Sequence, residues 1–138
     1  MIIKRIDDID SRTGDFIHEE FVHYGEANGV ELNYDEFCFA AEDESGKILG
    51  VITGRAYYNE VHIGDLIVAG DCRRSGLGSM LVHAVEDAYK GKGYDKITLT
   101  TFGFQAPDFY KKLGYEVEFV RKDKDPKLVK YFLSKTIG

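Results

Sequence analysis

The sequence predicts an α/β (α+β) fold, in which a mixed, mainly antiparallel sheet is flanked by helices in the order β-α-β-β-β-α-β-α-β-β. Short apolar segments separated by clusters of turn-forming residues are typical of strands. Between two of these segments, residues 77–89 carry an apolar stripe at helical spacing. A strand, a helix and a strand in succession favour one parallel crossover, and the hairpins on either side favour antiparallel pairing.

The N-terminal part predicts an edge strand followed by a helix. Residues 2–6 alternate weakly and are short, as an edge strand is. The helix is predicted from four apolar residues at helical spacing: Phe16, Ile17, Phe21 and Tyr24. Thr13 or Asp15 is the expected N-cap, and the helix should end near Gly25 or Gly29.

Three strands are predicted next. Residues 36–42 and 48–58 flank the turn-forming residues 43–47 and predict a β-hairpin. Residues 61–68 predict a third strand, whose alternation breaks at Gly64 and Asp65. A glycine inside a strand often marks a bulge that leaves main-chain groups unpaired.

The rest of the chain predicts two helices and three strands. The helix at residues 77–89 should end at Gly91 and Gly93. A strand at 96–101 precedes a short helix at 106–113, which has Pro107 in its first turn and is closed by Gly114. The last two strands are expected at 117–119 and 129–133, around a turn at 123–126.

Composition limits the function. The 138 residues fit a single domain spanning 1–138, with 43% apolar and 30% charged residues. No apolar run reaches the roughly 18–20 residues of a membrane span, and residues 1–8 lack the long apolar run expected of a signal peptide. Cys38 and Cys72 have no disulfide or metal pattern, so we expect a cytoplasmic protein. A net charge of −6 disfavours nucleic acid and favours cationic partners.

The segment Arg73-Arg74-Ser75-Gly76-Leu77-Gly78 predicts an anion site, because it joins a strand to the start of a long helix. The first N–H groups of a helix are unpaired and carry partial positive charge. Gly76 and Gly78 allow close approach of a phosphate, and Arg73 and Arg74 add charged donors. A dinucleotide site would need a third glycine, and a triphosphate loop would need Gly-Lys-Ser/Thr. Both patterns are missing.

These residues resemble the Gcn5-related N-acetyltransferase (GNAT) superfamily, whose signature is Arg/Gln-x-x-Gly-x-Gly/Ala after a bulged strand. A second segment, residues 106–115, is similar to the family motif Ala-x-x-Phe-Tyr-x-x-x-Gly-Phe/Tyr. The resemblance covers about residues 36–120. One departure is Gly103, where many relatives have an asparagine that contacts the pantetheine; Gln105 is a candidate replacement.

The resemblance implies acetyl-CoA as the acetyl donor and an amine as the acceptor. The N–H groups of residues 74–79, which include Ser79, would hold the pyrophosphate. The strand end Leu66-Ile67-Val68 would bind the pantetheine arm. Tyr110 lies where the family usually has the tyrosine that protonates the departing thiolate. Thiol and phenol pKa values of about 8.5 and 10 suit such a proton transfer.

Direct attack requires a neutral amine, so a proton acceptor is needed. Glu60, near the start of the strand before the phosphate loop, is the first candidate, because many relatives use a glutamate there. His62 and Asp65 on the same strand are alternatives, and Glu60 could equally be a solvated strand-edge charge. We expect no metal: His18, His23 and His83 lack metal-ligand spacing and fit surface or packing roles.

The acceptor should be bound by residues 13–35 and the 57–60 turn, where carboxylates and tyrosines suit a cationic amine. A helix face that is only exposed to solvent would have the same pattern of charged residues. Two other functions remain open: a non-catalytic acyl-CoA-binding sensor or partner domain on this fold, and a nucleotide-binding module. Small members of the superfamily are often homodimers, often through the C-terminal strands. Residues 129–133 have apolar neighbours on both faces, which fits such an interface and fits an internal strand equally well.

Overall fold

The computed structural model describes residues 1–105 and 107–138. It divides into two units, residues 1–33 and 34–138, and each is described by itself. The first unit contains one helix, and the second contains the sheet and two further helices. No helix in the described part of the chain is long and apolar enough to cross a bilayer.

The helix of the first unit is α1, Ser11–Ala27. Its N-cap is Asp10, because this residue is extended and its carboxylate accepts a hydrogen bond from the Thr13 N–H at 2.8 Å. The expected cap, Thr13 or Asp15, is therefore wrong: both residues lie inside the helix. Asn28 closes the C-terminus and Gly29 follows with a φ of +71°, so the predicted end is confirmed.

The strand expected at residues 2–6 is also wrong. These residues have no regular secondary structure, and Ile2 and Ile3 are 88% and 93% exposed. A strand is stabilised by a hydrogen-bonded neighbour, and a short weak alternation does not supply one.

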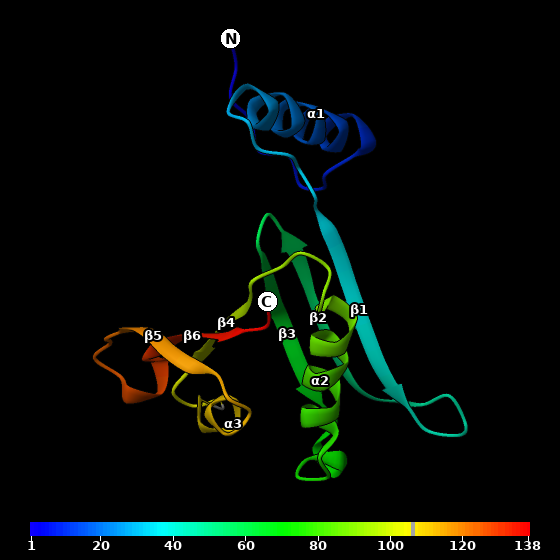
Figure 1. Ribbon diagram of the computed structural model, residues 1–138, viewed down its shortest axis with the longest axis vertical. Helices are drawn as coiled ribbons and strands as arrows, with labels where there is room; N and C mark the ends of the chain where they lie inside the picture. Colours follow the sequence, from blue (N-terminus) through cyan, green and yellow to red (C-terminus); the bar gives the residue numbers. More distant parts are fainter. Residues whose placement is uncertain (106) are drawn as a thin grey trace. The chain divides into compact units, whose positions relative to one another are not determined.

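The second unit is a six-stranded sheet in the order β1-β2-β3-β4-β6-β5 (Figure 1). The strands are β1 Asp35–Glu42, β2 Ile48–Tyr57, β3 Glu60–Val68, β4 Lys96–Phe102, β5 Glu116–Arg121 and β6 Lys130–Thr136. The helices are α2 Leu77–Tyr89 and α3 Pro107–Lys112, with short 3₁₀ turns at Gly70–Cys72 and Pro126–Leu128. Among the strands of the described residues, β3 and β4 are the one parallel pair, joined through the α2 crossover, so the predicted fold class is confirmed.

The strand β3 carries the predicted bulge. Thr53 of β2 pairs with Asp65, and the next residue pairs with Ile63, so Gly64 is the extra residue. On its other side, β3 pairs with β4 only through residues 60–62. Beyond His62 the two strands separate, and no strand of the described residues pairs with the edge of β3 that faces β4.

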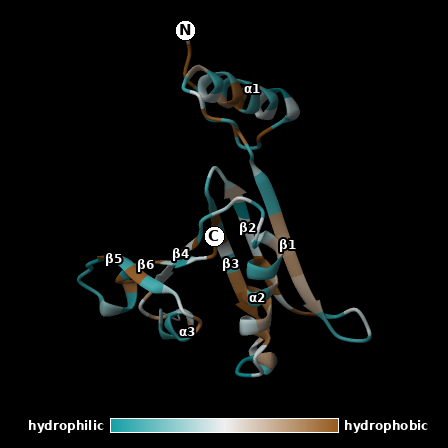
Figure 2. Ribbon diagram, viewed as in Figure 1, coloured by the Kyte–Doolittle hydropathy of each residue, from teal (hydrophilic) through white to brown (hydrophobic). Residues whose placement is uncertain are grey.

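Helix α2 covers the first three strands and forms the core with them. Its buried face consists of Leu81, Val82, Val85 and Tyr89. These side chains pack against apolar residues of the strands, which Figure 2 shows as hydrophobic stretches of β1 and β3. Complete burial of such a side chain contributes about 1.5–3 kcal/mol. The Tyr89 hydroxyl also donates a hydrogen bond of 2.7 Å to Asp35 on β1, so α2 is fixed to the sheet at its C-terminal end.

Candidate active site

A cleft of about 490 Å³ lies where β3 and β4 separate. It is lined by residues 51 and 53 of β2, 63–67 of β3, 99–101 of β4, Gln105, and Phe109 and Tyr110 of α3. The lining mixes apolar side chains with a few polar groups, as is typical of a small-molecule site. The predicted bulge residues and Tyr110, which lie far apart in the sequence, are therefore brought together.

The residues that line the cleft come from both faces of the sheet. Side chains alternate along a strand, so Thr53 lies on the opposite face from buried Ile52, which α2 covers. Asp65 pairs with Thr53 and shares its face, where the Thr53 hydroxyl lies 3.3 Å from the Asp65 carboxylate. Tyr110 belongs to the core under α2, on the other face. Two substrates could therefore enter the cleft from opposite faces of the sheet.

The predicted phosphate loop leads into α2 with an unusual backbone. Arg74 and Gly76 have φ angles of +65° and +85°, and Gly76 is the N-cap. The first helical hydrogen bond joins the Met80 N–H to the Gly76 carbonyl at 3.1 Å. The N–H groups of residues 77–79 precede this bond, so they are directed out of the helix start and can bind an anion.

Two side chains stabilise this loop. The Ser75 hydroxyl donates to the Cys72 carbonyl. The Arg73 guanidinium donates from Nε to the Val68 carbonyl at 3.3 Å, which fixes it to the end of β3. Gly78 faces α3: a Cβ there would lie 3.2 Å from the Phe109 ring. The loop therefore lies beside the cleft wall that Phe109 and Tyr110 form.

Tyr110 is almost completely buried, at 7% exposure, yet its hydroxyl has no hydrogen-bond partner among the described residues. Burial raises its pKa to about 12. The phenol therefore stays protonated at any physiological pH. A protonated, unpartnered hydroxyl in a cleft wall is a hydrogen-bond donor available to a ligand.

The three candidate bases lie at different places along β3. Only Asp65 lines the cleft. Glu60 pairs with Tyr57 and Lys96 at the closed end of β3, about four residues or ~13 Å from the bulge. His62 is half-buried, and its Nδ1 lies 2.9 Å from the Thr98 hydroxyl of β4. Burial lowers the pKa of His62 below 6.5, although the Glu60 charge opposes this shift.

The departure at Gly103 has a steric cause. A Cβ at this position would overlap the Pro126 carbonyl oxygen, so an asparagine does not fit. Gln105 lies in the cleft lining instead, where its Oε1 accepts hydrogen bonds from the Phe102 N–H at 2.9 Å and the Thr101 hydroxyl at 3.3 Å. Its amide nitrogen has no partner among the described residues. Ala106, the first residue of the second motif, lies outside the described part of the chain.

Sequence reasoning did not identify Thr53, Thr101 or Phe109 as residues of the site. Thr53 lies opposite the bulge only through the register of β2 and β3. Thr101 and Phe109 face the cleft because β4 and α3 lie beside it. Phe109 occupies the phenylalanine position of the motif at residues 106–115, and this was the available signal. Thr53 and Thr101 carry no such signal, since their place in the site depends on pairing between distant segments.

Gly103→Ala should lower the free energy of unfolding by about 1–3 kcal/mol, because the new methyl group forces the 126 carbonyl away. Urea denaturation would measure this. Gly70→Ala is the matched control, since a Cβ there meets nothing within 4 Å. Equal stability of the two variants would contradict the proposed clash.

His62→Gln should reduce the pH dependence of stability between about pH 7.5 and 5.5. The folded pKa of His62 lies below the unfolded value of 6.5. The unfolded chain therefore binds more protons in this window, and stability falls as the pH decreases. Thermal melts of both proteins at several pH values would test this; parallel curves would show that His62 does not contribute.

Comparison with known proteins identifies the family. The model of the acetyltransferase (GNAT) family matches residues 4–115. Blasticidin-S acetyltransferase of Streptomyces morookaense is 30% identical over 95 residues, which are 68% of this chain and 70% of that protein. The crystal structure of an acetyltransferase from Bacillus cereus is 34% identical, with a TM-score of 0.77 over 96% of this chain and 97% of that one.

An aminoglycoside 6′-N-acetyltransferase crystallised with coenzyme A shares the fold, with a TM-score of 0.63 and 19% identity over 99% of this chain and 97% of that one. The family match covers most of this chain and includes the bulged strand β3 and the glycine loop before α2. The chain is a member of the GNAT acetyltransferase family.

Proposed function

We propose that residues 1–138 form a single N-acetyltransferase domain, which moves the acetyl group of acetyl-CoA to a primary amine of a small molecule or peptide by direct attack. The observation that carries this proposal is the cleft between β3 and β4. It combines an unpaired strand edge, a helix N-terminus beside it and a buried tyrosine in its wall. The strand edge would pair with amide groups, the helix N-terminus would bind an anionic group, and the tyrosine hydroxyl would donate to a thiolate.

The donor end of the cleft fits acetyl-CoA. The pantetheine arm contains amides, which would pair with the free edge of Leu66-Ile67-Val68 as a neighbouring strand would. The pyrophosphate would bind the N–H groups at residues 74–79, with the charge of Arg73 and Arg74 nearby. Because Arg73 also holds the Val68 carbonyl, it would link these two subsites.

Tyr110 would act on the leaving group. When the amine nitrogen attacks the thioester carbonyl carbon, the C–S bond breaks and negative charge develops on sulfur. The Tyr110 hydroxyl would donate a hydrogen bond, and then its proton, to this sulfur. Its pKa of about 12 is well above the ~8.5 of an ordinary thiol, but burial in the same cleft raises the pKa of a thiolate as well.

Asp65 is our proposed partner of the amine, because it alone of the three candidate bases lines the cleft. Its carboxylate would hold the incoming ammonium group and pass the released proton to water. Glu60 and His62 lie toward the closed end, where β3 and β4 still pair. The relative named for blasticidin S supports a small amine as the acceptor.

Thiol release tests the proposed function. The protein should release free coenzyme A from acetyl-CoA only when a suitable amine is present, and a panel of aminoglycosides, polyamines, nucleoside antibiotics and lysine peptides would identify it. Calorimetry with acetyl-CoA, ATP and NAD is the companion measurement. Binding of acetyl-CoA without turnover of any amine would indicate a sensor, and preferential binding of ATP or NAD would contradict the CoA site.

Tyr110→Phe should lower kcat by about 10²-fold or more, because the leaving thiolate loses its proton donor. The dissociation constant for acetyl-CoA should change little, since the removed hydroxyl acts mainly in the transition state. Phe also preserves the buried ring. A kcat equal to that of the wild type would remove Tyr110 from the chemistry.

Asp65→Asn should lower kcat/KM for the amine by roughly 10- to 100-fold, the effect of losing a charged hydrogen bond. Glu60→Gln on the same strand is the matched control and should have a small effect. The pH–rate profiles of both variants would be compared with the wild type. If only Glu60→Gln removes the acidic limb, Glu60 is the base and Asp65 is not.

A further inference from the structure

The C-terminal end of α3 links Tyr110 to Tyr115 through the main chain. The Tyr115 N–H donates to the Tyr110 carbonyl at 3.0 Å, and the Gly114 N–H donates to the Lys111 carbonyl at 3.1 Å. Gly114 has a φ of +95°, so the three observations together define a Schellman motif. The two tyrosine rings also pack edge to face, with centroids 5.8 Å apart. A displacement of Tyr115 would therefore move Tyr110.

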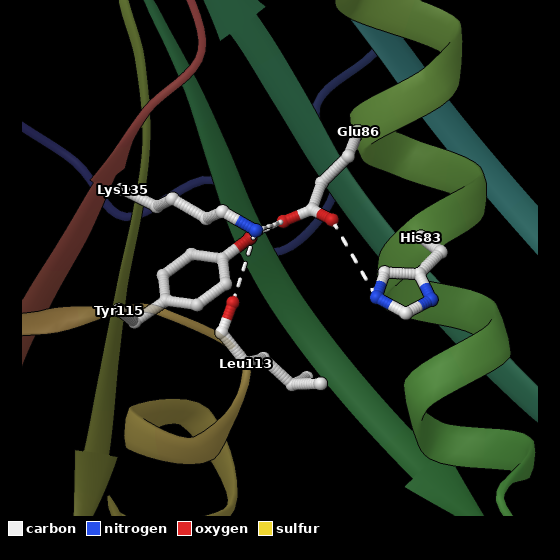
Figure 3. A network of polar contacts seen from close by, with 5 residues as sticks. All are labelled: His83, Glu86, Leu113, Tyr115 and Lys135. Atoms are coloured by element: carbon white, nitrogen blue, oxygen red, sulfur yellow. Dashed lines mark hydrogen bonds and ion pairs between the residues drawn. The ribbon is translucent and has the colours of Figure 1, made fainter.

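Tyr115 is held in turn by an ion pair from two other elements (Figure 3). Its hydroxyl donates to Oε2 of Glu86 on α2 at 3.0 Å. The Lys135 ammonium of β6 lies 2.9 Å from the same carboxylate oxygen. Lys135 also donates to the Leu113 carbonyl at 2.9 Å, at the end of α3. Here Glu86, Tyr115 and Lys135 are called the Glu86 network.

The network is shielded from water. Tyr115 is 2% exposed, and the side chains of Glu86 and Lys135 are 14% and 30% exposed. Contacts of this kind are screened less than surface ion pairs, and loss of one partner leaves a polar group unpaired. His83 approaches the other carboxylate oxygen of Glu86 only to 3.9 Å, from the solvent side.

Lys135 reaches the carboxylate across Gly114. A Cβ on this glycine would lie 3.4 Å from Lys135 Cε, so the lysine stem lies directly over the Schellman turn. Its positive charge at the C-terminus of α3 is also favourable for the helix dipole. The ion pair therefore fixes the turn from two sides, through the Leu113 carbonyl and through Tyr115.

We propose that the Glu86 network positions the Tyr110 hydroxyl in the cleft for the reaction, so that Glu86, Lys135 and Tyr115 are positioning residues of the active site. This rests on the proposed function of Tyr110. Helix α3 has six residues, too few to be stable without external contacts. The orientation of Tyr110 therefore depends on the groups that fix the end of α3, and a displacement of about 1 Å is enough to impair catalysis.

The test is a double-mutant cycle between Glu86→Gln and Tyr110→Phe. Glu86→Gln should lower kcat at least 10-fold and change the dissociation constant of acetyl-CoA less than threefold, because the phosphate loop and the β3 edge do not depend on it. In the Tyr110→Phe background, Glu86→Gln should have no further effect on kcat. Lys135→Met should behave like Glu86→Gln, and Lys135→Arg should recover most of the activity.

Two controls separate positioning from general stability. Asp87→Asn changes the adjacent, exposed carboxylate of α2, and Lys112→Met removes an exposed lysine of α3. Both should leave kcat unchanged. Each variant is assayed below its own melting temperature, so that all are folded. An equal loss of kcat in the wild-type and Tyr110→Phe backgrounds, or no loss, would overturn the proposal.

A second measurement does not need turnover and so separates failure of this proposal from failure of the proposed function. In protein labelled with ¹³C at the tyrosine ring, the Tyr110 resonance is assigned by its absence in Tyr110→Phe. It should shift in Glu86→Gln and Lys135→Met but not in Asp87→Asn. An unshifted resonance would overturn the positioning role even if no acceptor amine is found.

Discussion

The candidate site depends on the short parallel pairing between β3 and β4, which stops at His62 of β3. Main-chain N–H and C=O groups of a central strand are normally paired on both sides, and leaving them unpaired in a dry interior is costly. In this sheet only residues 60–62 of β3 pair with β4, and the rest of that edge opens onto the cleft. On the proposed function, the donor substrate would supply the missing pairing, so that its binding completes the sheet.

The separation is tolerated because both strands are fixed elsewhere. On its other side β3 pairs with β2 up to Val68, and β4 pairs with β6 along its whole length. The closed end is secured by the Asp95 main chain, whose N–H donates to the Asn59 carbonyl and whose carbonyl accepts from the Ile137 N–H, both at 2.8 Å. Helix α2 packs on the β3 side and, through Glu86, contacts the β6 side. The two halves can therefore separate at one end and stay joined at the other.

Features encoded by neighbouring residues could be predicted from the sequence. The bulge at Gly64, the glycine loop before α2 and the parallel crossover follow from local residue types and their order, and the structure contains all three. The prediction of a strand at residues 2–6 is wrong because an alternation of apolar residues does not show whether a neighbouring strand is present to pair with it. The predicted N-cap of α1, Thr13 or Asp15, is wrong because the helix begins before its first apolar residue, Phe16, and Asp10 caps it.

Features that depend on contacts between distant segments could not be predicted. Thr53 and Asp65 meet through strand register, and Glu86, Tyr115 and Lys135 come from three different elements. The placement of Asp65 in the cleft, with Glu60 at the closed end, has the same origin. The position of the bulge could be predicted, but the direction in which each β3 side chain points after it could not.

The two faces of the cleft suit the two proton-handling roles of the proposed reaction. An ammonium group and acetyl-CoA yield an amide, free coenzyme A and one proton, so a proton must leave for the solvent. Tyr110 lies on the buried face, where its raised pKa keeps the hydroxyl protonated, so that it would be a proton donor for the thioester sulfur. Asp65 lies on the exposed face, where water can accept the proton. On the proposed function, the amine and the thioester would meet where β3 and β4 separate, between the buried Tyr110 hydroxyl as proton donor and the exposed Asp65 carboxylate as proton acceptor.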